Sequence, residues 1–67
     1  MKFVVEINMD NAAFGDDPKK KAFELAKILL KLQRQVYESR FFFHSLEDIV
    51  LVDTNGNTVG TAKVVEE

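Results

Sequence analysis

A long uninterrupted helical segment dominates this chain and limits what the remainder can form. Between Pro18 and Arg40 the sequence contains neither a glycine nor a further proline, so no residue within it ends a helix. Asp17 can accept a hydrogen bond from a free N–H group of the first turn, and Pro18 suits the first helical position. We expect a helix over residues 18–39. In a chain of 67 residues, that helix leaves room only for short strands beside it.

Three segments outside the helix have the character of strands. Residues 2–9 alternate between apolar and polar side chains, which is typical of a half-buried strand. Residues 49–53 and 58–65 are rich in β-branched side chains and are separated by a short turn. The sequence therefore predicts an α+β fold, a single β-α-β-β domain over residues 1–67. We expect a three-stranded antiparallel sheet in the order 1-3-2, with the helix across one face.

The turn between the last two strands allows two registers. A type I turn over Asp53-Thr54-Asn55-Gly56-Asn57, with Gly56 in the left-handed conformation, pairs Leu51 with Val59 and Ile49 with Thr61. A two-residue turn at Asn55-Gly56 pairs Val52 with Val59 instead. We favour the first register.

The composition argues against several functional classes. There is no cysteine and only one histidine, His44, so we expect no metal and no cofactor. Ser39 and Ser45 lie in no nucleophile motif, and so small a chain has little room for a concave pocket, so we expect no enzymatic activity. No apolar run approaches about 18 residues, and the first residues lack the core of a signal peptide. We expect a cytoplasmic protein.

The predicted helix has more apolar surface than one small sheet needs. At about 100° per residue, one arc should pack on the sheet, and its members are Ala22, Leu25, Ala26, Leu29, Leu32 and Val36. A second line lies beside that arc and consists of Phe23, Leu30, Tyr37 and Phe41. We expect Phe23 to belong to the core and Ile28 to lie at the far margin of the arc, as a lone exposed apolar residue. The second line either completes the edge of the core or forms an exposed surface, and we favour the exposed surface.

Three consecutive phenylalanines, Phe41-Phe42-Phe43, strengthen this interpretation because adjacent large rings cannot all face one thin core. Most of the basic residues also lie in the helical segment, which favours an acidic partner. Lys27, Arg34 and His44 would form a polar rim. His44 is either a contact at the edge of this surface, where pH would tune affinity, or a solvated loop residue. The predicted protein-binding surface consists of Lys27, Leu30, Arg34, Tyr37, Phe41, Phe42, Phe43 and His44.

Single-stranded nucleic acid is the alternative ligand from another class. Lys27, Lys31, Arg34 and Arg40 lie beside Tyr37 and Phe41, and a basic strip with stacking side chains is typical of such proteins. Glu24, Glu38 and the net charge of −2 argue against this alternative.

Motifs near both ends suggest a family. Asp10-Asn11-Ala12-Ala13-Phe14, together with Asp53-x-Asn55-Gly56-Asn57-x-Val59-Gly60, resembles a group of small phage, prophage and bacterial proteins. The resemblance implies a strand, one long helix and a hairpin, with no established activity and no catalytic residues. The apolar middle of this chain departs from that pattern. We therefore expect an engineered binder on such a scaffold, monomeric rather than dimeric. The alternative is a natural phage-type protein that uses the surface for homodimerisation or for a host protein.

Overall fold

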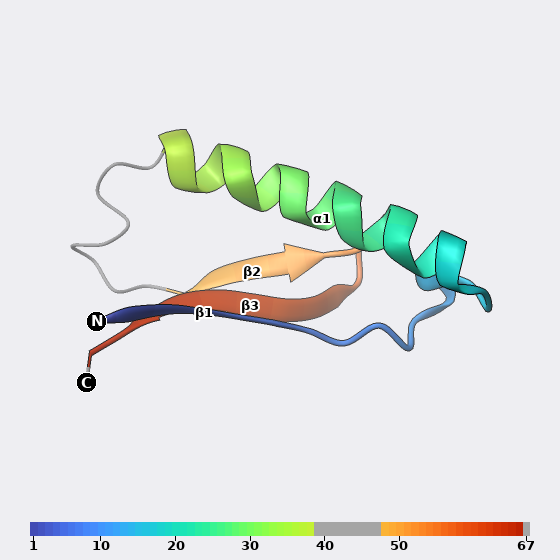
Figure 1. Cartoon of the computed structure of the whole chain (residues 1–67), viewed down its shortest axis with the longest axis horizontal. Helices are drawn as coiled ribbons and strands as arrows, with labels where there is room; N and C mark the ends of the chain where they lie inside the picture. The colour runs from blue at the N-terminus through green and yellow to red at the C-terminus, as the bar shows by residue number, and fades with distance from the viewer. Residues whose placement is uncertain (39–47, 67) are drawn as a thin grey trace.

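The computed structural model describes residues 1–38 and 48–66. These residues form a small α+β structure in which one long helix lies over one face of a three-stranded sheet (Figure 1). The fold class expected from the sequence is confirmed. In chain order the elements are β1 (Lys2–Ile7), the 3₁₀ helix η1 (Ala12–Phe14), α1 (Pro18–Glu38), β2 (Ile49–Val52) and β3 (Thr58–Val65).

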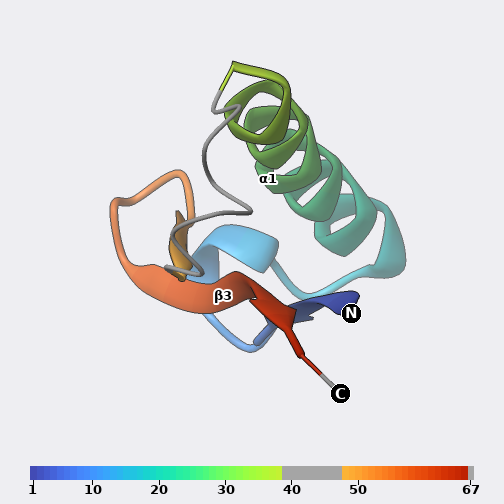
Figure 2. The ribbon, with the colours of Figure 1, turned by 90° about the vertical axis from the view of Figure 1, so that its left-hand side faces the viewer.

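The sheet is antiparallel throughout, and β3 lies at its centre in the order β1-β3-β2. Lys2 pairs with Val65 at one end of the β1–β3 ladder, and Ile7 pairs with Gly60 at the other. Viewed from the end of the molecule, α1 covers one face of the sheet (Figure 2). The turn between β2 and β3 therefore lies beside the first half of α1 and near η1 (Figure 1).

The pairing of β2 with β3 differs from the register we favoured. Next to the turn, Val52 lies opposite Thr58, as that register requires, but an irregularity between Leu51 and Val52 shifts the rest by one residue. The extra residue is Val59, whose side chain joins the buried core. A bulge of this kind lets an additional side chain face the core. The two predicted pairs are therefore wrong, and the observed ones are Leu51–Gly60 and Ile49–Ala62.

The core lies between α1, η1 and the inner face of β2 and β3. Phe14, on η1, is fully buried and anchors the connector between β1 and α1. Phe3 and Val5 on β1 are each 39% exposed, because α1 packs mainly on η1 and β2. The buried apolar cluster consists of Phe14, Ile28, Leu32, Leu51, Val59 and Ala62.

The helix turns a different side toward the sheet from the one we predicted. Ile28, expected to be exposed, is only 2% exposed, whereas Leu29, expected to face the sheet, is 44% exposed. Ala22 and Ala26 are also exposed. At about 100° per residue, the buried face is rotated by roughly 75° from the predicted arc. The physical reason is Glu24, a buried carboxylate that holds this side of α1 against the turn between β2 and β3.

Candidate functional site

Three large apolar side chains point away from the sheet along α1. Phe23 is 69% exposed, Leu30 is 52% exposed and Tyr37 is 84% exposed. Their spacing of seven residues aligns them along one side of a helix, and at about 100° per residue this side lies roughly opposite the buried face. Phe23 was expected in the core, and that expectation is wrong because the helix is rotated. We call the row of Phe23, Leu30 and Tyr37 the outer stripe.

The structure places half of the predicted protein-binding residues beside one another. Leu30 and Tyr37 belong to the outer stripe, and Lys27 and Arg34 flank it on one side of α1. Lys27, Leu30 and Arg34 also line one shallow hollow of about 260 Å³. The remaining predicted residues lie outside the described part of the chain, and they are Phe41, Phe42, Phe43 and His44.

A buried carboxylate organises the turn between β2 and β3. One oxygen of Asp53 accepts hydrogen bonds from the backbone N–H groups of Asn55 and Asn57, both at 2.9 Å. The other accepts a hydrogen bond of 2.9 Å from the side-chain amide of Asn11, in the connector after β1. The turn itself closes through a hydrogen bond from Gly56 N to Asp53 O, and Gly56 has the left-handed φ of 84° that we expected. Asp53 thus joins the connector after β1 to the turn between β2 and β3.

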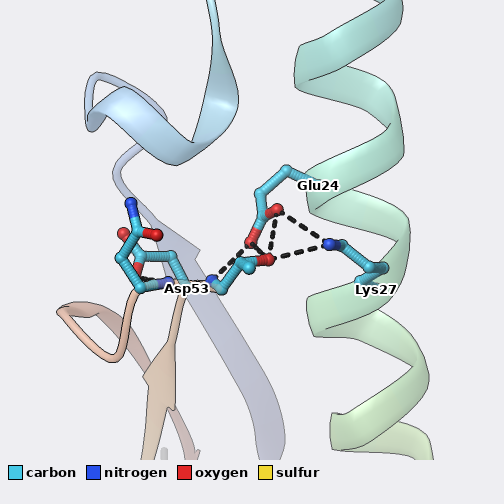
Figure 3. A network of polar contacts seen from close by, with 5 residues as sticks. Glu24, Lys27 and Asp53 are labelled. Carbon is cyan, nitrogen blue, oxygen red and sulfur yellow. Dashed lines mark hydrogen bonds and ion pairs between the residues drawn. The ribbon is translucent and has the colours of Figure 1, made fainter.

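A second buried carboxylate, Glu24, attaches α1 to the same turn (Figure 3). Its Oε2 accepts a hydrogen bond of 2.8 Å from the backbone N–H of Thr54, and its Oε1 accepts one of 2.7 Å from the Thr54 hydroxyl. Lys27 Nζ lies 3.3 Å from Glu24 Oε1 and donates a hydrogen bond of 2.8 Å to the Thr54 hydroxyl. Its ammonium group also lies 5.2 Å from the centre of the Phe23 ring.

Both carboxylates are stabilised in their charged form. The hydrogen bond from the Thr54 hydroxyl is the main cause that lowers the pKa of Glu24, and it outweighs the opposite effect of burial. The side-chain amide of Asn11 is the main cause that lowers the pKa of Asp53. Hydrogen bonds donated to a carboxylate favour its ionised state. The network therefore consists of two anions whose charges are compensated locally.

Sequence reasoning did not identify Glu24 and Asp53 as members of one network. Glu24 was interpreted as an acidic interruption of a basic helix surface, and Asp53 only as the first residue of a turn. The sequence did contain a signal for Asp53, because Asn11 and Asp53 belong to the two motifs that carry the family resemblance. The structure brings these motifs into direct contact. Nothing in the helix pattern indicated that Glu24 would be buried.

A cleft opens beside this network. It has a volume of about 780 Å³ and lies between the first half of α1, η1 and the turn between β2 and β3. Lys19, Lys20, Phe23 and Lys27 line it from the helix, and Thr54 and Asn55 line it from the turn. The side chain of Lys20 packs directly over Gly15, whose φ of 69° suits a residue without a side chain.

Burial of Glu24 changes the charge of the helix surface. The acidic residues of α1 are Glu24 and Glu38, and only Glu38 remains exposed. Lys27 is paired with Glu24, but Lys31 and Arg34 beside it lie on a surface with little opposing charge, a surface more basic than the sequence suggests. This charge pattern favours an anionic partner.

Comparison with known proteins identifies no family and no relative of the chain. No family model matches the chain, and no curated protein and no solved structure matches it significantly. None of the helices in the described part of the chain combines the length and hydrophobicity needed to cross a lipid bilayer. Within residues 1–38 and 48–66 there is also no group of three or more acidic or histidine side chains placed to hold a metal ion.

Proposed function

We propose that this protein is a non-catalytic protein-binding module that contacts its partner through the outer stripe of α1 and its basic flank. The observation that supports the proposal most directly is the exposure of Phe23, Leu30 and Tyr37, aligned on one side of the helix. Scattered exposed apolar residues are ordinary, but exposed apolar side chains aligned on one side of a helix and bordered by charge are typical of interaction surfaces.

The partner should be acidic and should present an apolar surface of its own. From Phe23 to Tyr37 the outer stripe rises by 14 residue steps along the helix, which is about 21 Å at 1.5 Å per residue. Lys27 and Arg34 lie along one edge of this row, where they would meet carboxylates on a partner. An amphipathic helix with acidic residues along one side fits this arrangement, because helices recognise one another through rows of this period.

Affinity capture from a bacterial lysate, with matched variants, tests the proposal. Leu30→Gln combined with Tyr37→Gln removes two of the three apolar side chains while retaining good helix formers. Loss of such anchors typically weakens binding by about 30-fold or more. Val50→Thr is the control, because it changes an exposed apolar side chain of β2 that does not belong to the outer stripe. Val50 lines a separate hollow with Lys31 and Arg34, so this variant also reports on contacts beside the basic flank.

Proteins that the parent and the Val50→Thr variant retain, but the double variant loses, would support the proposal. Each such protein is then purified, and its affinity for the three chains is measured by calorimetric titration. If folded parent and folded double variant retain the same proteins, the outer stripe is not the binding surface.

Single-stranded nucleic acid is a second candidate, favoured by one specific observation. Burial of Glu24 removes an acidic residue that argued against a basic strip, and Phe23 and Tyr37 are exposed as stacking platforms require. Fluorescence anisotropy with a labelled oligothymidine, repeated at increasing salt, separates the two candidates. Affinity for nucleic acid should fall steeply with salt, whereas affinity for a protein through aromatic anchors should fall only modestly.

The origin of the outer stripe belongs to the same proposal. An apolar helix surface between family-like ends supports an engineered binder on a small phage-type scaffold. The rival is a natural phage-type protein that uses this surface for homodimerisation or for a host protein. These alternatives differ in the expected oligomeric state, because the engineered binder should be a monomer whereas homodimerisation would give a dimer.

A further inference from the structure

The cleft beside α1 has the features of a small-molecule site and is separate from most of the outer stripe. Its volume of about 780 Å³ lies within the range of about 300–1,000 Å³ that is usual for ligand pockets. Three elements form its walls: η1, the first half of α1 and, from a distant part of the sequence, the turn between β2 and β3. Leu30 and Tyr37 do not line it.

Hydrogen bonds hold the walls of the cleft in place. The Asn11–Asp53 contact joins the connector to the turn, and the Glu24–Thr54 contacts join the turn to the helix. Gly15 allows the stem of Lys20 to lie directly over the backbone, where a side chain would displace it. A preformed cleft loses little conformational entropy when a ligand enters it, which favours binding.

The cleft is positively charged. Three lysines and one carboxylate line it, so its net charge is 3 − 1 = +2. Glu24 is already compensated by Lys27 at 3.3 Å and by hydrogen bonds from Thr54. Among residues 1–38 and 48–66, no acidic side chain forms an ion pair with Lys19 or Lys20, although the Asp17 side chain accepts a hydrogen bond from the backbone of Lys20. These two ammonium groups, near the positive end of the helix dipole, remain available to an anion.

The cleft also offers a flat apolar surface. The ring of Phe23 is largely exposed on the helix side, and Ala12 and Ala13 lie on the side of η1. An aromatic ligand can stack on such a ring at a separation typical of aromatic pairs.

We propose that the cleft binds an organic phosphate with a flat aromatic body. A phosphate monoester carries about −1.5 to −2 charges near neutral pH, which matches the net charge of the lining. Lys19 and Lys20 would contact the phosphate, and Phe23 would stack against the ring. The polar edge formed by Thr54 and Asn55 would set the orientation of the ligand.

NMR titration of the ¹⁵N-labelled chain with 1-naphthyl phosphate tests this proposal. We expect saturable shifts of the amide signals of Ala12, Ala13, Phe23 and Asn55, with a Kd of about 1 mM for a ligand of this size. Neutral 1-naphthol and inorganic phosphate, titrated separately, should each bind at least about tenfold more weakly, because each offers only half of the required contacts. Equal binding of 1-naphthol would contradict the role of the lysines, and equal binding of inorganic phosphate would contradict the role of Phe23.

Matched variants test which lysines contact the phosphate group. Lys19→Gln combined with Lys20→Gln should weaken the binding of 1-naphthyl phosphate about five- to tenfold, as expected for two exposed ion pairs. Lys31→Gln combined with Lys63→Gln removes the same charge outside the cleft and should leave the Kd unchanged. An equal loss in both double variants would show a general charge effect and overturn the site.

The same titration separates this inference from the proposed protein-binding function. Leu30→Gln combined with Tyr37→Gln should leave the affinity for 1-naphthyl phosphate unchanged while abolishing protein capture. If 1-naphthyl phosphate produces no saturable shifts in the cleft of the parent chain, the small-molecule site is wrong, whatever the result of the capture experiment.

Discussion

Two carboxylates, Glu24 and Asp53, illustrate how single residues define this structure. A buried charge is costly unless it is paired and hydrogen-bonded. Glu24 accepts hydrogen bonds from both donors of Thr54 and lies close to Lys27, and Asp53 accepts three hydrogen bonds from separate donors. Bonds to an ionised acceptor are about twice as strong as bonds between neutral groups. These contacts join η1, α1 and the turn between β2 and β3, so we expect them to contribute to stability.

The lowered pKa values of Glu24 and Asp53 predict a loss of stability in acid. A carboxylate whose pKa is lower in the folded chain than in the unfolded chain binds fewer protons when folded, so acid favours unfolding. The contribution should be complete above the ordinary values of 4.5 for Glu24 and 3.8 for Asp53. It should disappear as the pH falls through the lower values of the folded chain. Urea denaturation at a series of pH values measures this effect.

The Glu24→Gln variant tests whether Glu24 contributes to the loss of stability in acid. The variant should be less stable than the parent near neutral pH, and the difference between the two should shrink as the pH falls below about 4.5. Glu38→Gln is the control, because it removes the same charge from an exposed position of the same helix. A parent and a Glu24→Gln variant whose stabilities run parallel over the whole acidic range would contradict the role given to Glu24.

Gly60 is a residue whose missing side chain matters. A Cβ atom at this position would collide with the carbonyl oxygen of Glu6 and lie 2.9 Å from the Cα atom of Ile7. These are backbone atoms of the neighbouring strand, which cannot move aside without disturbing the ladder between β1 and β3. We expect Gly60→Ala to destabilise the fold by about 1–3 kcal/mol or more, measured by thermal or urea denaturation.

Gly56→Ala separates steric conflict from backbone strain. Gly56 has a φ of 84° but no atom within 4 Å of a Cβ built on it, so its substitution should cost only the strain of the left-handed conformation, about 1–2 kcal/mol. The two variants should also perturb different parts of the structure. Gly60→Ala should change the NMR signals of β1, whereas Gly56→Ala should change only those of the turn. An undisturbed β1 in the Gly60→Ala variant would count against the close approach of the two strands.

At the scale of elements, the orientation of α1 is the feature that the hydrophobic pattern did not predict. Ile28 is 2% exposed and the adjacent Leu29 is 44% exposed. Ile28→Ala should therefore destabilise the chain by about 2–5 kcal/mol, as is usual when a buried aliphatic side chain is truncated. Leu29→Ala should cost about 1 kcal/mol or less, since a half-exposed side chain leaves no enclosed cavity. Urea denaturation of both variants measures the difference, and the reverse order of costs would show that the helix faces the sheet as the pattern predicted.

The contrast between predicted and observed elements has a physical basis. Local chemistry identified α1, which begins at Pro18 as expected and extends to Glu38, where the first described part of the chain stops. It also identified the hairpin, because Asn55-Gly56 is a strong turn signal. The rotation of α1 depends instead on Glu24 and Thr54, which are far apart in sequence and meet only in the folded chain. A polar residue that is buried because of a distant partner is invisible to a pattern of apolar residues.

The register of β2 and β3 also depends on contacts that the local sequence does not contain. The turn residues correctly predicted the pairing next to the turn, where Val52 lies opposite Thr58. The bulge beyond it places Val59 in the core and brings Gly60 against β1. Its position therefore depends on contacts with a third strand, which the hairpin sequence alone does not contain. The candidate site combines features set by local sequence with features set by distant contacts. The helix pattern predicted that Leu30 and Tyr37 are exposed, whereas the cleft depends on long-range contacts.

At the scale of the whole molecule, the distribution of charge bears on the oligomeric state. A symmetric dimer would bring identical surfaces of two copies together. In an antiparallel pairing through the outer stripe, Lys27 of one copy would lie beside Arg34 of the other, and this repulsive contact would occur twice. A parallel pairing would instead align the lysine-rich first turns and the helix dipoles of the two copies. Both arrangements are unfavourable, so we expect a monomer, as the engineered-binder hypothesis requires.

Light scattering coupled to size exclusion tests this expectation at low and at high salt. The parent should elute as a monomer of 7.6 kDa at low ionic strength. Any association through the outer stripe should increase with salt, because salt screens the repulsion between Lys27 and Arg34. A stable dimer at low salt would support the natural phage-type alternative, in which this surface serves homodimerisation.

Arg34→Glu provides the sharper version of the same prediction. In an antiparallel pair the substitution would turn both repulsive contacts with Lys27 into attractive ones, and opposite charges along such an edge are what select helix partners. The variant should therefore associate more strongly than the parent at low salt, and added salt should weaken its association rather than strengthen it. Lys63→Glu, which makes the same change of charge on the sheet, is the control and should remain monomeric. If Arg34→Glu and Lys63→Glu associate equally, the self-association does not involve the outer stripe, and the monomeric state of the parent has another cause than repulsion along α1.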